Sequence, residues 1–279
     1  MSTSGAALKP PHDTYPSSFP PVSQEQSTSL ATIRSRIETD VVPATFTPPE
    51  KELAKQWLDD ACLRRYLVAH KGNVEAAVKG LKETVVWRKE YKVSSIRADE
   101  VKSEAVSGCN YFNGFDRAGR PIIYLKKKAT SENPELNVRL LVYTIETAIK
   151  AMPQGIEKLH IIMDFTLYTR ANSPPLHISR LTLSILQNHY PERLGRCHMV
   201  NAPWVFSLFW NMFSPFVDPI TREKIKFVTL TKGKAKEGEK SPILEDVEEG
   251  MLEVEYGGKN GFVYDHDAYW RGASEAALI

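Results

Sequence analysis

The chain contains little cysteine, and its three residues, Cys62, Cys109 and Cys197, lie far apart without a CxxC spacing. This distribution argues against a disulfide framework and suggests no zinc site, so we expect a reduced, intracellular protein without a bound metal. The N-terminus lacks the apolar core of a signal peptide, and no segment is expected to span a membrane.

The chain also lacks an excess of charge, because 36 Lys and Arg nearly balance 34 Asp and Glu to leave a net charge of +2. Such a chain has no general attraction for polyanions, so nucleic acid is not an expected partner. Basic residues do gather late in the sequence, at Arg222, Lys224, Lys226, Lys232, Lys234 and Lys236. Beside an apolar helix this stretch favours contact with anionic lipid, and a solvated loop is the alternative.

Familiar enzyme signatures are missing as well. The sequence has no GxxxxGK[ST], GxGxxG, GxSxG or HExxH motif. No serine or cysteine lies in a recognisable nucleophile elbow, so we expect no catalytic residues and mostly structural or surface roles for the histidines. Asp164, at the end of a strand-like run, is expected to act as a cap or a polar anchor.

The most unusual segment is a window at 197–217 that contains no Asp, Glu, Lys or Arg. Prolines and polar residues interrupt it, which leaves 204–213 as the predicted helix. About ten residues cannot cross roughly 30 Å of hydrocarbon at about 1.5 Å per residue. The helix is apolar on both sides and must be covered on both. Its large aromatic residues are Trp204, Phe206, Phe209, Trp210 and Phe213.

The order of elements predicts an α/β fold preceded by a small helical bundle. Residues 1–48 are rich in Pro, Ser and Thr and are expected to be mostly disordered. Residues 49–95 form the expected helical module, with a helix capped by Asn73. In 96–272 strands alternate with helices, which implies βαβ units and a mainly parallel sheet. The expected elements there are a hairpin turning at 116–119, helices at 137–152 and 176–189, and strands at 159–165, 196–201 and 224–230.

Three runs of sequence resemble the CRAL-TRIO family of lipid-binding proteins, and in particular its phosphatidylinositol-transfer members. They are LRRYLVAHKGNVEAAVKGLKETVVWRKEY, DRAGRPIIYL and HYPERLGRCHMVNAPWVFSLFWNMFSPFVDPITREKIKFV. The resemblance implies that a parallel sheet and helices enclose an apolar lipid cavity. It also implies that the helix at 204–213 is a gate that closes this cavity.

The resemblance further implies a set of lipid-binding residues. The phosphoinositol-binding positions of the family match Glu192, Thr221, Lys224 and Lys71. Thr221 and Lys224 would hold the phosphate, and Glu192 would accept hydrogen bonds from inositol hydroxyls. The founding members have Arg where this chain has His70, which replaces a permanent forked donor by an imidazole.

A second ligand is implied by the same comparison. The positions that surround the choline phosphate in founding members match Phe112, Ile123, Leu159 and Ile161, and none of these offers a polar group. An apolar lining suits a sterol or another neutral lipid, because a buried zwitterion without partners is costly. The tail at 256–270 resembles the fungal branch linked to azole resistance and sterol handling.

The expected function is therefore a non-enzymatic exchange of phosphatidylinositol for a sterol or other neutral lipid at membranes, without a cofactor. The resemblance also implies presentation of the lipid to a phosphoinositide kinase. The expected location is the cytoplasm, with peripheral attachment to endoplasmic reticulum, lipid droplets or other membranes.

Three alternatives remain open at this point. One is a haem-binding member of the same fold, with an axial ligand drawn from His160, His177, Tyr168 and His198. Another is an α/β hydrolase with an unfamiliar triad drawn from Asp164, His189 and a serine such as Ser184. The third is a membrane-recruited adaptor in which lipid only fills the interior.

Overall fold

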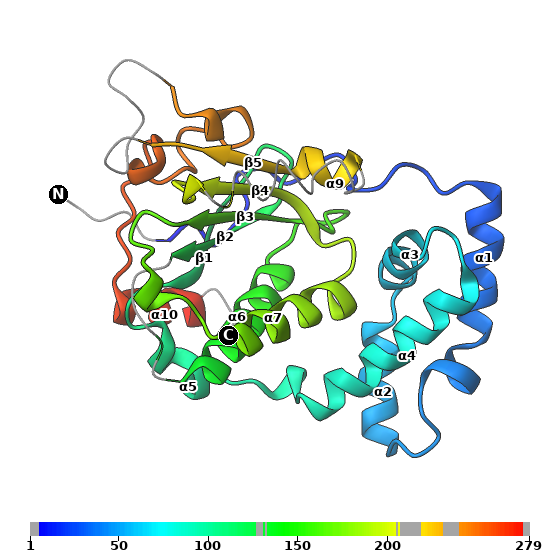
Figure 1. The fold of residues 1–279 in the computed structure, drawn as a ribbon. Coiled ribbons are helices and arrows are strands. Elements are labelled where there is room, and N and C mark those ends of the chain that lie inside the picture. The colour runs from blue at the N-terminus through cyan, green and yellow to red at the C-terminus, as the bar shows by residue number, and fades with distance from the viewer. Residues whose placement is uncertain are drawn as a thin grey trace. The chain divides into compact units, whose positions relative to one another are not determined.

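The computed structural model of the chain describes residues 6–126, 131, 133–204, 206, 219–230 and 240–275, with the backbone alone at 219–221 and 275. The chain divides into two compact units (Figure 1). Unit 1 comprises Met1–Ser18, Arg97–Pro175 and Leu194–Ile279, and unit 2 comprises Phe19–Ile96 and Leu176–Arg193. The helical unit is thus larger than the predicted module at 49–95, and it includes the helix at 176–189.

Unit 2 is entirely helical within the described residues. Two of its helices follow capping residues, because Asp59 and Asn73 accept hydrogen bonds from the backbone N–H groups of Cys62 and Ala76. The helix after Asn73 begins where the sequence predicts. The elements are α1 (Gln24–Ser35), η1 (Ile37–Val41), α2 (Pro48–Trp57), α3 (Asp60–Ala69), α4 (Val74–Glu90), η2 (Val93–Ser95) and α7 (Leu176–His189).

The helix α1 lies in the segment that was expected to be mostly disordered, and that expectation does not hold for these residues. Ser23 and Gln26 form a capping box at its start. Its Leu30 and Ile33 enter the apolar core of unit 2, and Phe46 follows them there. The segment has few large apolar residues, but those few are placed where they are buried.

Unit 1 is built around a five-stranded sheet in the order β1-β2-β3-β4-β5. Only β1 and β2 pair antiparallel and the other pairs are parallel, which confirms the predicted mainly parallel sheet. The strands are β1 (Asn110–Phe115), β2 (Pro121–Lys126), β3 (Leu159–Asp164), β4 (Leu194–Val200) and β5 (Ile225–Val228). The other elements are α5 (Ala98–Val101), η3 (Lys102–Ala105), α6 (Pro134–Lys150), η4 (Arg170–Asn172), α9 (Pro219–Lys224), η6 (Pro242–Glu245), η7 (Val254–Tyr256) and α10 (His266–Glu275).

The two faces of this sheet differ in chemistry. Ile161 pairs with Ile123 on one side and Cys197 on the other, whereas His160 pairs with Ile122 and Arg196. Because side chains alternate along a strand, the first row lies on one face and the second row on the opposite face. We call them the apolar face and the polar face.

The edge strand β1 is protected by α10. The hydroxyl of Tyr269 donates to the carbonyl oxygen of Phe112 at 2.9 Å and accepts from the N–H of the same residue at 3.1 Å. One side chain thus satisfies both backbone groups of a residue at the edge of the sheet.

Most of the predicted gate helix at 204–213, including Phe209, Trp210 and Phe213, lies outside the described residues. Trp204 is described and its side chain is 76% exposed. Phe206 packs against Phe165, with ring centroids 5.2 Å apart. Over the part of the chain that is described, no helix is both long and apolar enough to span a membrane.

Candidate functional site

The apolar face carries a row of side chains that solvent reaches, although three of the four strands that carry them are central in the sheet. Met163 of β3 pairs with Leu125 of β2 and Met199 of β4, and Met199 pairs with Phe227 of β5. All four side chains are half-buried. Apolar residues in the middle of a sheet are normally covered by close-packed neighbours. This row, which we call the apolar floor, is therefore not covered by close packing among the described residues.

The four residues predicted to line a second-ligand site also belong to the apolar face. Phe112 pairs with Ile123 and Ile123 with Ile161, and Leu159 alternates with His160 on β3. The structure thus gathers them on one face. Phe112, Ile123 and Leu159 are buried, and only Ile161 is half-buried, so the accessible part of the face extends from Ile161 to the apolar floor.

The predicted phosphoinositol residues are divided between the units. Thr221 and Lys224 lie on α9 in unit 1, and the side chain of Thr221 falls outside the described residues. Lys71 and Glu192 lie in unit 2, where both have the left-handed backbone conformation, with φ of 52° and 56°. Non-glycine residues rarely adopt this conformation, and it recurs at functional sites.

Lys71 occupies the position at which a helix commonly ends in glycine. Its N–H donates to the carbonyl of Val68 at 2.9 Å, and the N–H of Gly72 donates to the carbonyl of Leu67 at 2.9 Å. These two bonds form a Schellman motif after α3, in which Lys71 is the left-handed residue. Its side chain is exposed. The motif projects an ammonium group from a site where a lysine is conformationally unfavourable.

His70 ends α3 and lies against α4. A Cβ atom added at Gly80 would come within 2.9 Å of its Nε2, so this glycine makes room for the imidazole. The imidazole of His70 is therefore packed against its own unit.

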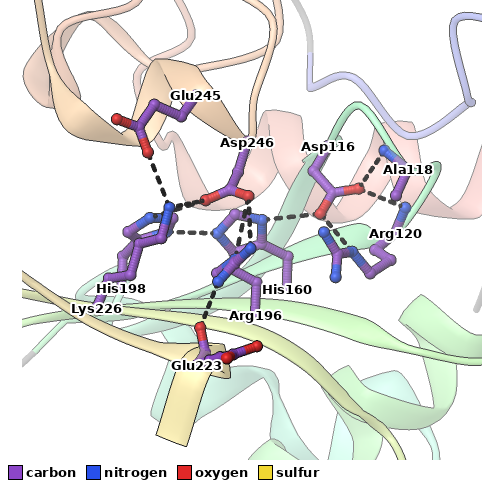
Figure 2. A network of polar contacts seen from close by, with 10 residues as sticks. All are labelled: Asp116, Ala118, Arg120, His160, Arg196, His198, Glu223, Lys226, Glu245 and Asp246. Carbon is purple, nitrogen blue, oxygen red and sulfur yellow. Dashed lines mark hydrogen bonds and ion pairs between the residues drawn. The ribbon is translucent and has the colours of Figure 1, made fainter. Parts of the chain in front are cut away.

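The polar face holds a buried network of charged groups and two histidines (Figure 2). His160 Nε2 lies 2.7 Å from His198 Nδ1, and His160 Nδ1 lies 3.1 Å from Asp116 Oδ2. His198 Nε2 lies 3.3 Å from Asp246 Oδ2. Both histidine side chains are fully buried. A chain of four side chains thus crosses the sheet from the β1–β2 turn to the end of η6.

Arginine and lysine side chains hold the two carboxylates. Asp116 Oδ2 accepts from Arg120 Nε at 2.6 Å. Asp246 accepts from Arg196 at 3.0 Å and from Lys226 at 3.2 Å. Burial raises the pKa of Asp246, but the nearby His198, Arg196 and Lys226 outweigh this and hold it below its usual value.

The same burial works against charge on the imidazoles. It lowers the pKa of His160 to about 4, although Asp116 opposes the effect. It also lowers the pKa of His198, where Asp246 opposes it. Protonation of a buried imidazole is disfavoured by desolvation, so both rings are neutral at neutral pH.

A second polar cluster on this face centres on Glu253. Its carboxylate accepts from Tyr111 at 3.0 Å and from Asn113 at 2.9 Å, and Lys126 lies 3.5 Å away. Nearby, Asp164 accepts from the N–H of Thr166 and from the hydroxyl of Tyr256. Asp164 therefore anchors the segment after η6 to the end of β3, as the sequence predicts.

The proposed hydrolase triad is not formed, because each of its members is engaged elsewhere. Asp164 has the two partners just described, and His189 Nδ1 lies 2.9 Å from the hydroxyl of Thr84. The ring of His189 also stacks on Trp87 with centroids 4.1 Å apart. Ser184 accepts from the side chain of Asn188.

The residues suggested as haem ligands are also placed unfavourably for that role. His160 and His198 are buried against each other, and Tyr168 shares a hydrogen bond with Ser173 at 2.5 Å. His177 is exposed on α7 in the other unit. Within the described ranges no cluster of three or more His, Cys, Asp and Glu could hold a metal ion.

Comparison with known proteins identifies the fold. A family model described as the CRAL/TRIO domain matches residues 105–258. The crystal structure of Sfh5 superposes with a TM-score of 0.59 at 17% identity, and the match covers 93% of this chain and 99% of that one. At this identity the likeness shows the fold alone.

Sequence relatives extend the comparison. The chain is 36% identical over 235 residues to the phosphatidylinositol transfer protein PDR17 of Saccharomyces cerevisiae, covering 80% of this chain and 64% of that protein. It is 32% identical over 240 residues to the Sec14 cytosolic factor of Schizosaccharomyces pombe, covering 77% and 81%. A CRAL-TRIO domain-containing protein of S. pombe is 35% identical over 240 residues, but the chain spans only 22% of its length. The resemblance seen in the sequence is confirmed: the chain belongs to the CRAL/TRIO domain family.

Proposed function

We propose that this protein binds phosphatidylinositol and transfers it between membranes without catalysing a reaction, exchanging it for a sterol or another neutral lipid. The observation that carries the proposal is the apolar floor. Solvent reaches Met163, Met199 and Phe227 on the apolar face of the sheet, whereas the polar face is filled with polar contacts. Burying such a row beneath lipid chains contributes about 25 cal/mol per Å² of apolar surface.

Two methionines that pair across β3 and β4 suit a floor that accepts more than one lipid. Met163 and Met199 are unbranched and can adjust their side-chain torsions to different chains or rings. Ile161, the accessible member of the predicted second-ligand set, extends the same surface toward the middle of β3. No member of this set offers a hydrogen bond to a zwitterionic head group, which favours a neutral second lipid.

The head group in this proposal is bound by Lys71, Glu192, Thr221 and Lys224. The relative named as a phosphatidylinositol transfer protein supports the choice of lipid. Lys71 and Glu192 have the left-handed backbone conformation that is enriched at functional sites, although Lys92 and Asn201 adopt it as well.

The gate proposed at 204–213 allows exchange at a membrane. Trp204 is exposed at its first turn and presents a large indole to its surroundings. Burying about four aromatic side chains in a bilayer contributes several kcal/mol as an upper bound, which permits transient docking but not permanent anchoring. Attachment to endoplasmic reticulum or lipid droplets, and delivery to a phosphoinositide kinase, belong to the same proposal.

Transfer between vesicles tests the proposal. Labelled phosphatidylinositol is placed in donor liposomes, and its appearance in acceptor liposomes is followed with and without the protein. Lys224→Ala is expected to reduce the rate at least tenfold, whereas Arg222→Ala, an exposed cation on the same helix α9, should leave it nearly unchanged. Equal rates for the two variants would remove Lys224 from the head-group site.

The second lipid is identified by extracting the purified protein and analysing the extract by mass spectrometry. A sterol or another neutral lipid beside phosphatidylinositol is the expected result. Abundant phosphatidylcholine in the extract would contradict exchange for a neutral lipid, while leaving phosphatidylinositol transfer intact.

A further inference from the structure

The two buried imidazoles on the polar face and two carboxylates are joined by a series of contacts (Figure 2). Three contacts join the four side chains, at 3.1 Å from Asp116 to His160, 2.7 Å from His160 to His198 and 3.3 Å from His198 to Asp246. A carboxylate oxygen can only accept, so each contact becomes a hydrogen bond only if a proton lies on an imidazole nitrogen facing it. Three hydrogen bonds therefore require three ring protons.

Two neutral imidazoles carry only two ring protons, one each. The short contact between His160 and His198 must hold one of them, because two nitrogen lone pairs would repel at 2.7 Å. Only one of the two outer contacts can then be a hydrogen bond. The neutral pair leaves a nitrogen lone pair facing a carboxylate oxygen.

The geometry indicates which nitrogen lacks the proton. His198 Nε2 is buried and makes no aligned hydrogen bond, although it lies 3.3 Å from Asp246 Oδ2. His160 Nδ1, in contrast, is placed to donate to Asp116. In the neutral pair His160 thus carries its proton on Nδ1, and His198 carries its own on Nδ1 and donates to His160.

Charged groups from every neighbouring element act on this pair. Asp116 and Asp246 favour a proton on the rings, whereas Arg120, Arg196 and Lys226 oppose it. Glu245 lies 2.9 Å from Lys226 and offsets part of that charge. Tyr15, from the N-terminal segment, interacts electrostatically with Asp116, and burial is the main cause of its raised pKa. The cations and anions nearly balance, so one added proton changes the local charge substantially.

The network continues from Asp246 to α9. Arg196 donates to Asp246 at 3.0 Å and, through Nη1, to the carbonyl oxygen of Glu223 at 2.6 Å. Glu223 directly precedes Lys224 at the end of this helix. The position of this helix end is therefore fixed in part by the same carboxylate that faces the unprotonated nitrogen.

We propose that His198 Nε2 is a one-proton site that positions α9 through Asp246 and Arg196. A proton taken up from solvent converts the contact with Asp246 into a hydrogen bond and draws that carboxylate toward the imidazole. Asp246 then holds Arg196 and Lys226 less strongly, and the end of α9 shifts with Arg196. Arg196 is thus a positioning residue for Lys224. The role of Lys224 in lipid binding rests on the proposed function above.

Nitrogen-15 NMR of the uniformly labelled full chain tests the proposal. Two-bond correlations between ring nitrogens and carbon-bound protons report the tautomer of each histidine as the pH is lowered from 8. At pH 8 we expect a proton on Nδ1 and none on Nε2 of His198, followed by one protonation at Nε2. The backbone amides of Glu223 to Lys226 should shift with the same midpoint.

Three results would overturn the proposal: a protonated Nε2 at pH 8, a ring that stays neutral down to the pH of unfolding, or amides that do not follow His198. The variant His198→Asn retains an N–H toward His160 and removes Nε2, so its amides should lose the titration. His177→Asn, at an exposed histidine, should retain it. If His198→Asn does not fold, the titration of the unmodified protein decides alone. Absence of lipid transfer at every pH would contradict the proposed function and leave the NMR result standing.

Discussion

Substitutions at Lys71 can separate the effect of its backbone strain on stability from the effect of its ammonium group on lipid transfer. Its φ of 52° costs about 1–2 kcal/mol for a residue with a Cβ atom, and glycine avoids this cost. The two backbone bonds of the Schellman motif involve no side-chain atom of Lys71, so they persist in any variant that keeps the conformation. Glycine at this position should therefore stabilise the end of α3.

The net gain is smaller than the relief of strain, because glycine also increases the conformational freedom of the unfolded chain by about 0.5–1 kcal/mol. Lys71→Gly should thus be more stable than Lys71→Ala by about 0.5–1 kcal/mol, which corresponds to a rise of about 2 °C in melting temperature for a chain of this size. Both variants lose the ammonium group, and both should transfer phosphatidylinositol more slowly than the unmodified protein.

Urea denaturation of the two variants, followed by circular dichroism, measures the difference in free energy of unfolding, and the vesicle assay measures transfer. Alanine at least as stable as glycine would show that the left-handed conformation is not strained in the folded protein. Unchanged transfer in both variants would show that the strain is not retained for head-group binding.

Three further predictions concern the polar face, the apolar floor and the gate. Burial lowers the pKa of His160 from 6.5 to about 4, so its neutral form contributes stability that is present above pH 6.5 and lost as the pH falls toward 4. At about 1.36 kcal/mol per pH unit the full contribution is about 3 kcal/mol. Denaturation at pH 7 and at pH 5 should therefore show that the free energy of unfolding falls by about 2 kcal/mol. Met163→Glu should abolish copurification of lipid, while the same change at the exposed Leu167 should not; lipid phosphorus in purified samples measures both. Phe209→Ser should slow vesicle transfer severalfold without changing the melting temperature, and an unchanged rate would exclude this side chain from membrane contact.

Much of the fold could be predicted because its signals are local. The start of α4 follows from one asparagine, and the hairpin follows from the turn at 116–119. The helix α1 was missed because its segment is poor in apolar residues on average, and burial of Leu30 and Ile33 depends on helices that come later in the chain. Local composition does not report contacts of this kind.

The polar network could be predicted only in part. His160, Arg196, His198 and Lys226 alternate with apolar residues along three strands, a period-two pattern that indicates a polar face. Asp246 lies in a short turn far along the chain, and nothing in its local sequence marks it. The register between strands is what places these side chains together, and that register is a property of the folded sheet.

The hydroxyl of Tyr269 has a consequence for the solubility of the protein. By engaging both backbone groups of Phe112, it occupies the hydrogen-bonding positions that a strand from another molecule would use. Local unfolding of α10 would leave the backbone N–H and carbonyl groups of Phe112 unpaired at the edge of β1, a strand rich in aromatic residues. Self-association on storage or heating should therefore begin with detachment of this last helix, well before the core of the sheet is lost.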